Sequence, residues 1–358
     1  MRQLYLAATG QNRGKTTAAL GLVDGFIRRG YRTGFMKPVG QRTVMEEGTP
    51  ADEDAVLMRA VFDLPEPYPV MSPVHIPRGF TKAYIAGEVV EDLGARIRRA
   101  HEVFHDHDVL LVEGTGHAGV GAVIGLSNAV VAAALRAPAV IVSEGGVGRP
   151  IDEIVLNAAL FERQGVPVAG AIVNKVDVVA QPGIRSVLER GLAPHGIALL
   201  GVLPVRPLLS NPTLEMIEAG LDGELIHSGP DLDRVIDDVA IAAMEPRHAL
   251  EHVGPGTLVI VPGDREDVIT TLAGTRLAGL VLTGGYPPRS TTIEAIHRAN
   301  LFAVIVAAET YAVASKIHDL LVKTHPADRE KIELIKQLVG ANLDVDRILD
   351  VATEPAAA

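Results

Sequence analysis

The residues best suited to chemistry stand in one segment near the N-terminus, Thr9-Gly10-Gln11-Asn12-Arg13-Gly14-Lys15-Thr16-Thr17. An apolar run, 4–8, precedes it, and an apolar stretch typical of a helix, 18–23, follows. A strand, a glycine loop and a helix in this order predict a phosphate-binding loop, whose amides and helix N-terminus attract a polyphosphate. We expect Lys15 to reach the terminal phosphates and the Thr16 hydroxyl to bind magnesium. A glycine-rich turn with an exposed lysine is the alternative.

The loop departs from the usual spacing. Three residues separate Gly10 from Gly14, and the common form of the motif has one residue more between its glycines. Thr9 therefore occupies the position of the first glycine.

Two further charged residues stand at the ends of predicted strands. Lys37 ends the strand 33–37 and could add positive charge beside the phosphates, although a surface lysine before a turn is the simpler interpretation. Glu113 ends the apolar strand 109–113, where a buried acid needs a charged partner or a metal. Glu113 is therefore a candidate for the magnesium shell, with a satisfied structural acid as the alternative.

An acidic stretch, Asp52-Glu53-Asp54, precedes an apolar run typical of a helix. Its carboxylates could bind magnesium or cap the helix N-terminus. Capping is a sufficient explanation for Asp52.

Asn174-Lys175-Val176-Asp177 follows the predicted strand 168–174 and matches the guanine-reading motif of GTPases. An amide side chain both donates and accepts, so Asn174 can read a purine edge. Related ATP-binding folds also carry an asparagine here, which leaves ATP and GTP both open.

Composition limits the classes of protein. The chain has 358 residues, of which 47% are apolar and 22% charged, and a prior of about 150 residues per domain predicts two domains. The absence of cysteine excludes disulfides and thiol chemistry and suits a reducing cytoplasm, where we expect the protein. A net charge of -11 argues against a nucleic-acid partner. No apolar run is long enough for a membrane span, and no signal peptide is recognisable.

Short β-branched runs alternate with helical patterns over residues 1–205. This alternation predicts an α/β fold in which a parallel sheet is covered by helices on both faces. Ligands bind at the carboxyl ends of such strands, where the polar residues above stand. The predicted strands are 4–8, 33–37, 109–113, 139–143, 168–174 and 198–203, and the predicted helices include 17–29, 93–104 and 151–164.

A proline-rich segment, 206–212, predicts a domain boundary, and a smaller α/β domain follows over 206–325. Residues 326–358 are expected to form a C-terminal helix and a tail that frays from 352 onward. In this part of the chain we expect helices over 214–218, 235–244, 309–323 and 328–339, and strands over 257–261, 279–282 and 302–306.

The order of the motifs in the first domain resembles the dethiobiotin synthetase and cobyrinic acid a,c-diamide synthase group of P-loop proteins. The resemblance implies that the loop binds ATP and that Lys37 contacts phosphate. It implies that Asp54 and Glu113 hold Mg2+ and that Asn174 helps to hold the base. It also implies a homo-oligomer, because this group commonly pairs subunits near the active site.

The second domain resembles the DRTGG domain, through Pro262-Gly263-Asp264-Arg265 and Leu282-Thr283-Gly284-Gly285. Thr310-Tyr311 and Lys331-Ile332 also fit its pattern. A dethiobiotin synthetase-like domain followed by DRTGG resembles the N-terminal half of long bacterial phosphate acetyltransferases. No segment of this sequence supports acetyl transfer.

The glycine turns of the second domain have a physical interpretation of their own. The amides of Gly263, Gly284 and Gly285 could approach a small anionic effector, to which Arg265 would pair. A tight turn with a surface pair between Asp264 and Arg265 is the alternative. DRTGG domains are associated with regulation.

Three functions remain open at this point. The first is an Mg-ATP-binding regulator or metabolic sensor with slow hydrolysis. The second is an ATP-dependent ligase that activates a carboxylate, for which Thr115, His117 and Arg42 are possible substrate anchors. The third, a corrinoid-related enzyme, comes from a local resemblance of segment 9–22 to ATP:corrinoid adenosyltransferases.

Overall fold

The computed structural model describes residues 1–318, 320 and 323–352. The chain folds into two compact units: Met1–Val205 together with Thr324–Ala358 form the first, and Arg206–Lys323 form the second. The C-terminal segment 326–358 is thus part of the first unit. Most of the tail expected to fray, 353–358, lies outside the described residues.

The first unit is built on a parallel sheet of six strands in the order β10-β9-β8-β1-β7-β2. Its strands are apolar along most of their length because helices cover both faces of the sheet. The strands are β1 (Arg2–Ala8), β2 (Thr33–Met36), β7 (Val109–Glu113), β8 (Ala139–Glu144), β9 (Val168–Val176) and β10 (Leu199–Pro204).

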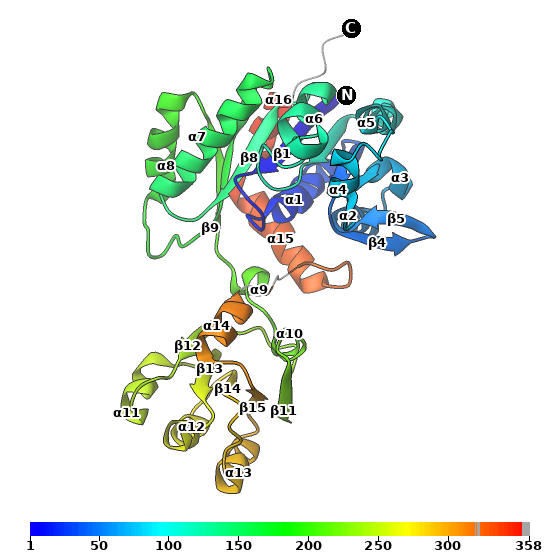
Figure 1. Cartoon of the computed structure of the whole chain (residues 1–358). Helices are drawn as coiled ribbons and strands as arrows, with labels where there is room; N and C mark the ends of the chain where they lie inside the picture. Colours follow the sequence, from blue (N-terminus) through cyan, green and yellow to red (C-terminus); the bar gives the residue numbers. More distant parts are fainter. Residues whose placement is uncertain (319, 321–322, 353–358) are drawn as a thin grey trace. The chain divides into compact units, whose positions relative to one another are not determined.

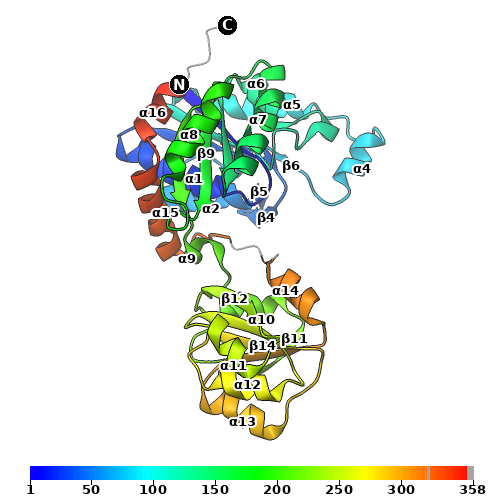
Figure 2. The same ribbon diagram turned by 90° about the vertical axis from the view of Figure 1, so that its left-hand side faces the viewer.

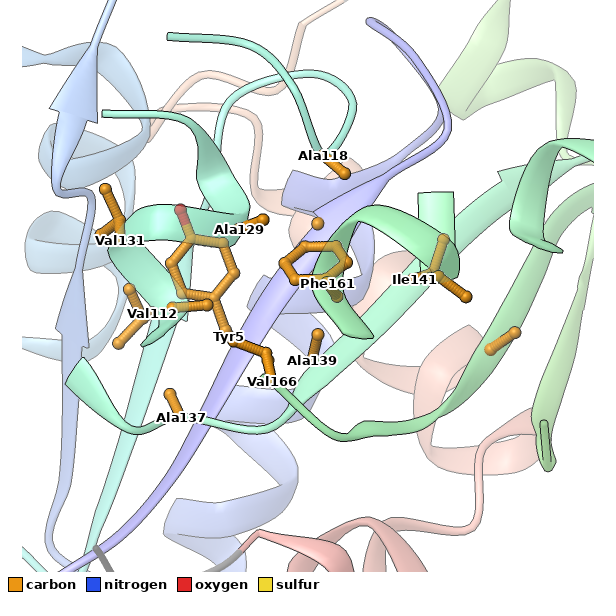
Figure 3. Close-up of a cluster of buried hydrophobic side chains, with 14 of the residues drawn as sticks. Tyr5, Val112, Ala118, Ala129, Val131, Ala137, Ala139, Ile141, Phe161 and Val166 are labelled. Carbon is orange, nitrogen blue, oxygen red and sulfur yellow. The ribbon is translucent and has the colours of Figure 1, made fainter. Parts of the chain in front are cut away.

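One face of this sheet packs against a row of four helices, and Figure 3 shows part of the core between them. Tyr5 of β1 lies there beside Phe161, with ring centroids 6.4 Å apart. This arrangement confirms the predicted α/β fold with a parallel sheet covered on both faces. The four helices are α5 (Leu93–Glu102), α6 (Asn128–Leu135), α7 (Gly148–Arg163) and α8 (Ile184–Leu192).

The other face carries α1 (Lys15–Arg28), α15 (Arg329–Asn342) and α16 (Val345–Val351). Figure 1 shows α15, from the end of the chain, beside α1 from its beginning. The helices approach closely at Gly21, where an added Cβ would lie 2.2 Å from the Cβ of Val339. The expectation that Lys331-Ile332 belongs to the DRTGG pattern is therefore wrong, because both residues lie in α15 of the first unit.

Shorter elements connect this framework. No helix in the described part of the chain is both long and apolar enough to cross a membrane. The shorter elements are β3 (Val39–Gly40), β4 (Thr43–Glu46), β5 (Thr49–Asp52), α2 (Glu53–Phe62), α3 (Tyr68–Met71), β6 (Val74–His75) and α4 (Phe80–Ile85).

The second unit contains a five-stranded sheet in the order β11-β15-β14-β13-β12. Figure 1 labels its five strands, and Figure 2 shows the same unit from another side. Only β11 runs antiparallel to its neighbour. Apolar cores lie on both faces of the sheet. The elements are α9 (Pro207–Ser210), α10 (Leu214–Gly220), β11 (Gly223–His227), β12 (Asp238–Ile241), α11 (Pro246–Ala249), β13 (Thr257–Pro262), α12 (Glu266–Ala273), β14 (Gly279–Thr283), α13 (Ser290–Arg298), β15 (Phe302–Val306) and α14 (Thr310–His318).

The helix expected over 235–244 is wrong, because β12 (Asp238–Ile241) occupies this segment. Ile236, Val239 and Ala242 recur every third residue, which favours a helix by spacing alone. The segment instead pairs in parallel with β13 at the edge of the sheet, where one side of the strand is unpaired. The sequence could not show this pairing, because β13 supplies the partner groups from outside the segment.

Gly21→Ala tests the packing of the C-terminal segment on the first unit. We expect this variant to lower the free energy of unfolding by about 1–3 kcal/mol, because the new methyl group collides with Val339. Urea unfolding measures the loss. Gly340→Ala in α15 is the matched control: an added Cβ there meets no atom within 4 Å, so it should stabilise the helix by roughly 0.5–1 kcal/mol. Equal effects of the two changes would contradict the described packing.

Candidate functional site

The predicted phosphate loop joins the central strand of the first sheet to a helix. β1 ends at Ala8 and α1 begins at Lys15, with Gly14 as its N-cap at φ 90°. Strand β1 lies between β7 and β8, where the strand order reverses in direction along the sheet. Parallel α/β sheets bind ligands at such a point. Gly10, Gln11, Asn12 and Arg13 lie in the loop, and Thr16 and Thr17 follow in the first turn of α1.

Four predicted residues converge beside the start of α1. The Lys37 ammonium donates to Asp54 Oδ2 at 2.5 Å and to Glu113 Oε1 at 3.0 Å. The Thr16 hydroxyl lies 3.0 Å from Asp54 Oδ1 and 3.2 Å from Glu113 Oε1. Lys37 is 4% exposed and Glu113 is fully buried, so these charges are compensated within the protein. Lys37 is thus not the surface lysine of the simpler interpretation.

Burial and neighbouring charges shift the pKa values of this cluster. Burial raises the pKa of Glu113 to about 7, and the charge of Asp54 adds to this effect against the opposing Lys37. Burial is also the largest single influence on Asp54 and acts in the same direction, but the charge of Lys37 and the hydrogen bonds that Lys37 and Thr16 donate together lower the pKa of Asp54 to about 2. Burial would lower the pKa of Lys37, yet the two carboxylates raise it above its ordinary value.

Lys15 stands in the same electrostatic environment. It is 8% exposed, and burial lowers its pKa to about 8, with the positive charge of Lys37 acting in the same direction. A buried ammonium group of this kind gains from an anion placed beside it. Lys15 therefore differs from the exposed lysine of the alternative interpretation.

A short hairpin positions Asp54. Strands β4 and β5 meet at a turn in which Glu47 and Gly48 both have positive φ, the geometry of a tight β-turn. β5 ends at Asp52, whose carboxylate caps α2 by accepting from the backbone N–H of Asp54 at 3.0 Å. The predicted capping role of Asp52 is confirmed. The hairpin was not predicted, because Glu47-Gly48 is not among the residue pairs that are typical of a two-residue hairpin turn.

Asn128 holds the turn after Glu113, and sequence reasoning missed it. Its Nδ2 donates to the carbonyls of Thr115 and His117 at 2.8 and 2.6 Å, and its Oδ1 accepts from the Tyr5 hydroxyl at 2.9 Å. The turn can approach this closely because an added Cβ at Gly114 would lie 2.5 Å from Asn128 Oδ1. No local pattern marks Asn128, which begins a helix far from the turn in sequence.

Asn174 and Lys175 contact the backbone of the phosphate loop. Asn174 Nδ2 donates to the carbonyl of Arg13 at 3.1 Å, and Lys175 Nζ donates to that of Asn12 at 2.9 Å. A Cβ at Gly14 would lie 1.9 Å from Asn174 Nδ2, so the glycine makes room for this amide. In this structure the predicted base-binding residue braces the loop.

Two acids, which the sequence did not mark as site residues, also hold the loop. Glu144, at the end of β8, forms an ion pair with Arg13. Glu153 of α7 accepts from the hydroxyl of Thr9 at 2.8 Å. The threonine at the first-glycine position thus has a defined partner, which explains how the shortened loop is anchored.

The cluster suits a hard divalent cation. The Thr16 hydroxyl lies within hydrogen-bond distance of a carboxylate oxygen of Asp54 and of one of Glu113, and Mg2+ prefers such oxygen ligands. Glu113 Oε2 is buried and has no hydrogen-bond partner among the described residues. Among those residues, no group of three or more acidic or histidine side chains forms a metal site, so water and phosphate would have to complete the shell.

The predicted ligand turns of the second unit follow β13 and β14. Thr283 is 2% exposed, and its hydroxyl lies 2.8 Å from that of Thr310. The amides of Gly263, Gly284 and Gly285 all donate to backbone carbonyls at 2.9–3.0 Å. An anion would have to displace these bonds to use the amides.

Arg265 is engaged as well. Its guanidinium bonds both carboxylate oxygens of Asp267 at 3.1 Å. Its partner is thus Asp267, and not the Asp264 of the alternative interpretation.

Gly14→Ala tests the close approach of Asn174 to the loop. We expect a loss of about 1–3 kcal/mol in unfolding free energy, because alanine is strained at this φ and collides with the amide. In a double-mutant cycle, we expect the variant that carries both Gly14→Ala and Asn174→Ala to lose at least about 0.5 kcal/mol less unfolding free energy than the sum of the two single losses. Gly10→Ala is the control, since its Cβ would meet only the flexible end of Arg13, at 3.2 Å. Strict additivity would contradict the contact.

Comparison with known proteins agrees with two domains. A family model for an AAA domain matches residues 2–213, and a model for a DRTGG domain matches residues 216–320. The phosphate acetyltransferase of Pseudomonas aeruginosa is 27% identical over 371 residues, covering 97% of this chain and 51% of the relative. That of Deinococcus radiodurans is 28% identical over 363 residues, covering 96% and 50%. The chain spans about half the length of the curated relatives it matches.

Solved structures resemble parts of the chain. The MinC:MinD cell division protein complex of Aquifex aeolicus matches with a TM-score of 0.37 and 14% identity, covering 58% of this chain and 84% of that one. The CBS and DRTGG domains of the regulatory region of Clostridium perfringens pyrophosphatase, complexed with the activator diadenosine tetraphosphate, match with a TM-score of 0.28 and 15% identity, covering 41% and 79%. The strand order of the first sheet and the two family matches together define the fold. The chain belongs to the AAA domain family over residues 2–213 and joins to this P-loop domain a DRTGG domain over residues 216–320.

Proposed function

We propose that this protein is a regulator that binds Mg-ATP at its P-loop domain and hydrolyses it slowly at most. The observation that carries the proposal is the convergence of Lys15, Thr16, Lys37, Asp54 and Glu113 at the N-terminus of α1. Two lysines and a helix N-terminus attract the phosphates, and the hydroxyl and carboxylates suit the metal that accompanies them. ATP is proposed over GTP because of the resemblance to ATP-binding P-loop proteins.

The regulatory part of the proposal rests on how the chain is connected. The second unit is inserted between β10 and α15, and both of these elements belong to the first unit. Helix α15 packs on α1, whose first residue is Lys15. A shift of α1 on nucleotide binding would therefore reach the segment that re-enters from the DRTGG domain. Such coupling requires two arrangements with different affinity for the nucleotide.

The ligase alternative has less support. A cavity beside the turn after Glu113 is lined by Val39, Gln41, Thr115 and further uncharged residues. A carboxylate substrate needs a cationic or strongly polar anchor, and the Thr115 hydroxyl already donates to the carbonyl of Val39 at 2.7 Å. His117 and Arg42 are both exposed, and neither lines the cavity.

Calorimetric titration with ATP and with GTP, each with and without Mg2+, tests the function. We expect magnesium-dependent binding of ATP that Lys15→Ala weakens by at least about 100-fold, because a buried ammonium beside the phosphates is lost. Lys316→Ala, on the surface of the second unit, is the matched control and should bind as the wild type does. Phosphate release then measures hydrolysis.

Failure of the wild type to bind either nucleotide would refute the proposal. Binding of GTP alone would reassign the base and keep the site. A fast phosphate release that depends on an added carboxylate would instead favour the ligase.

A further inference from the structure

The position between the two candidate metal-binding carboxylates is filled by a side chain of the protein itself. The ammonium of Lys37 lies 2.5 Å from Asp54 Oδ2 and 3.0 Å from Glu113 Oε1. The Thr16 hydroxyl bonds the other oxygen of Asp54 and the same oxygen of Glu113. An ammonium group thus stands where these three oxygen-bearing side chains meet.

Charge balance favours this arrangement when no nucleotide is bound. Lys15 and Lys37 carry two positive charges, and Asp54, Glu113 and the buried Asp52 carry three negative ones, so the cluster holds at most one excess negative charge when all five are ionised, which is too little to balance a dication. A dication that entered beside both lysines would leave a buried excess of positive charge. If Lys37 moved away to make room, its ammonium would lose both carboxylate partners at a site where it is only 4% exposed.

A nucleotide changes this balance. Its phosphates bring several negative charges to the start of α1, close to Lys15. Lys37 also lies close to Lys15, since the charge of Lys37 lowers the pKa of Lys15. Phosphates bound beside Lys15 would therefore attract the Lys37 ammonium as well. They offer the Lys37 ammonium a second anionic partner. Asp54 and Glu113 are then free to accept a metal, together with the Oε2 atom of Glu113 that has no partner in the described structure.

We infer that Lys37 is a resident counter-ion that keeps a divalent metal off Asp54 and Glu113 until a nucleotide phosphate draws the lysine away. The inference rests on the proposed function, because it assigns a regulatory step to the same site. Its consequence is an order of binding: the metal ion binds together with the nucleotide phosphates or after them. In the absence of nucleotide, the metal ion binds weakly. Lys37 is a positioning residue here, and its effect is on metal affinity.

The test is Mn2+ binding in the absence of nucleotide. Electron paramagnetic resonance measures this binding as the loss of the signal of free Mn2+. Mn2+ accepts the same oxygen ligands as Mg2+. We expect the wild type to bind weakly and Lys37→Met, which keeps the length of the side chain and removes its charge, to bind at least about tenfold more tightly. Lys15→Met is the matched control: it removes an equal charge from the site, but Lys15 is not paired with these carboxylates, so we expect a smaller gain.

Three results would overturn the inference. They are tight binding of bare Mn2+ by the wild type, no gain in Lys37→Met, and an equal gain in Lys15→Met. Lys37→Met leaves two carboxylates without their partner, so its folding is followed by circular dichroism with and without excess Mn2+. A variant that folds only with the metal supports the inference, because the dication then replaces the ammonium. A variant that folds under neither condition contradicts it.

The test separates this inference from the proposed function, because no nucleotide is present. A wild type that binds no nucleotide would refute the function whatever the Mn2+ result. A wild type that binds Mg-ATP while Lys37→Met gains no affinity for Mn2+ would retain the function and remove the role of Lys37.

Discussion

The first unit depends on the compensation of a carboxylate that is buried at the carboxyl end of β7, one strand in from the edge of the sheet. Glu113 ends β7, is fully buried and stands in register with Leu6 of β1. An isolated buried carboxylate is costly, so the fold must bring a cation to it. Lys37 does this from the end of the neighbouring strand β2, and Asp54 shares the same ammonium. Lys37 directly follows β2, and Asp54 follows the hairpin in the first turn of α2, so these elements supply the two side chains that pair with each other beside Glu113.

The order of the strands places these charged residues beside the phosphate loop. Because all six strands are parallel, their carboxyl ends share one edge, and the reversal of order at β1 opens this edge where the phosphate loop stands. On one side of β1 in the sheet, Glu144 comes from β8 and Glu153 from α7, the helix that follows it. On the other side, Glu113 comes from β7 and Lys37 from the end of β2. Glu144 and Glu153 therefore hold the loop through Arg13 and Thr9, and Lys37 and Glu113 lie on its other side, beside the start of α1.

Much of the architecture could be predicted from the sequence. The strands of the first unit are fully buried apolar runs, and their pattern depends little on which neighbour they pair with, so their positions and the fold class were predicted correctly. The helix prediction for 235–244 was wrong because the local sequence of an edge strand has only a weak preference for the strand conformation, and its partner β13 stabilises it. The C-terminal helix α15 was recognised as a helix, but its packing on Gly21 of α1 joins residues separated by most of the chain.

The sequence by itself determined the phosphate loop, because strand, glycines, lysine and helix are consecutive and their geometry is local. It also identified Lys37, Glu113 and Asn174 as candidates through their positions at the ends of predicted strands, and the resemblance to a known family added Asp54. Only the tertiary structure decided which of them touch: Lys37 with the two carboxylates, Asn174 with the carbonyl of Arg13, and Asn128 with the turn after Glu113. The physical reason is that these contacts are made across strands and helices, so each depends on the sheet order and on burial, which no single segment encodes.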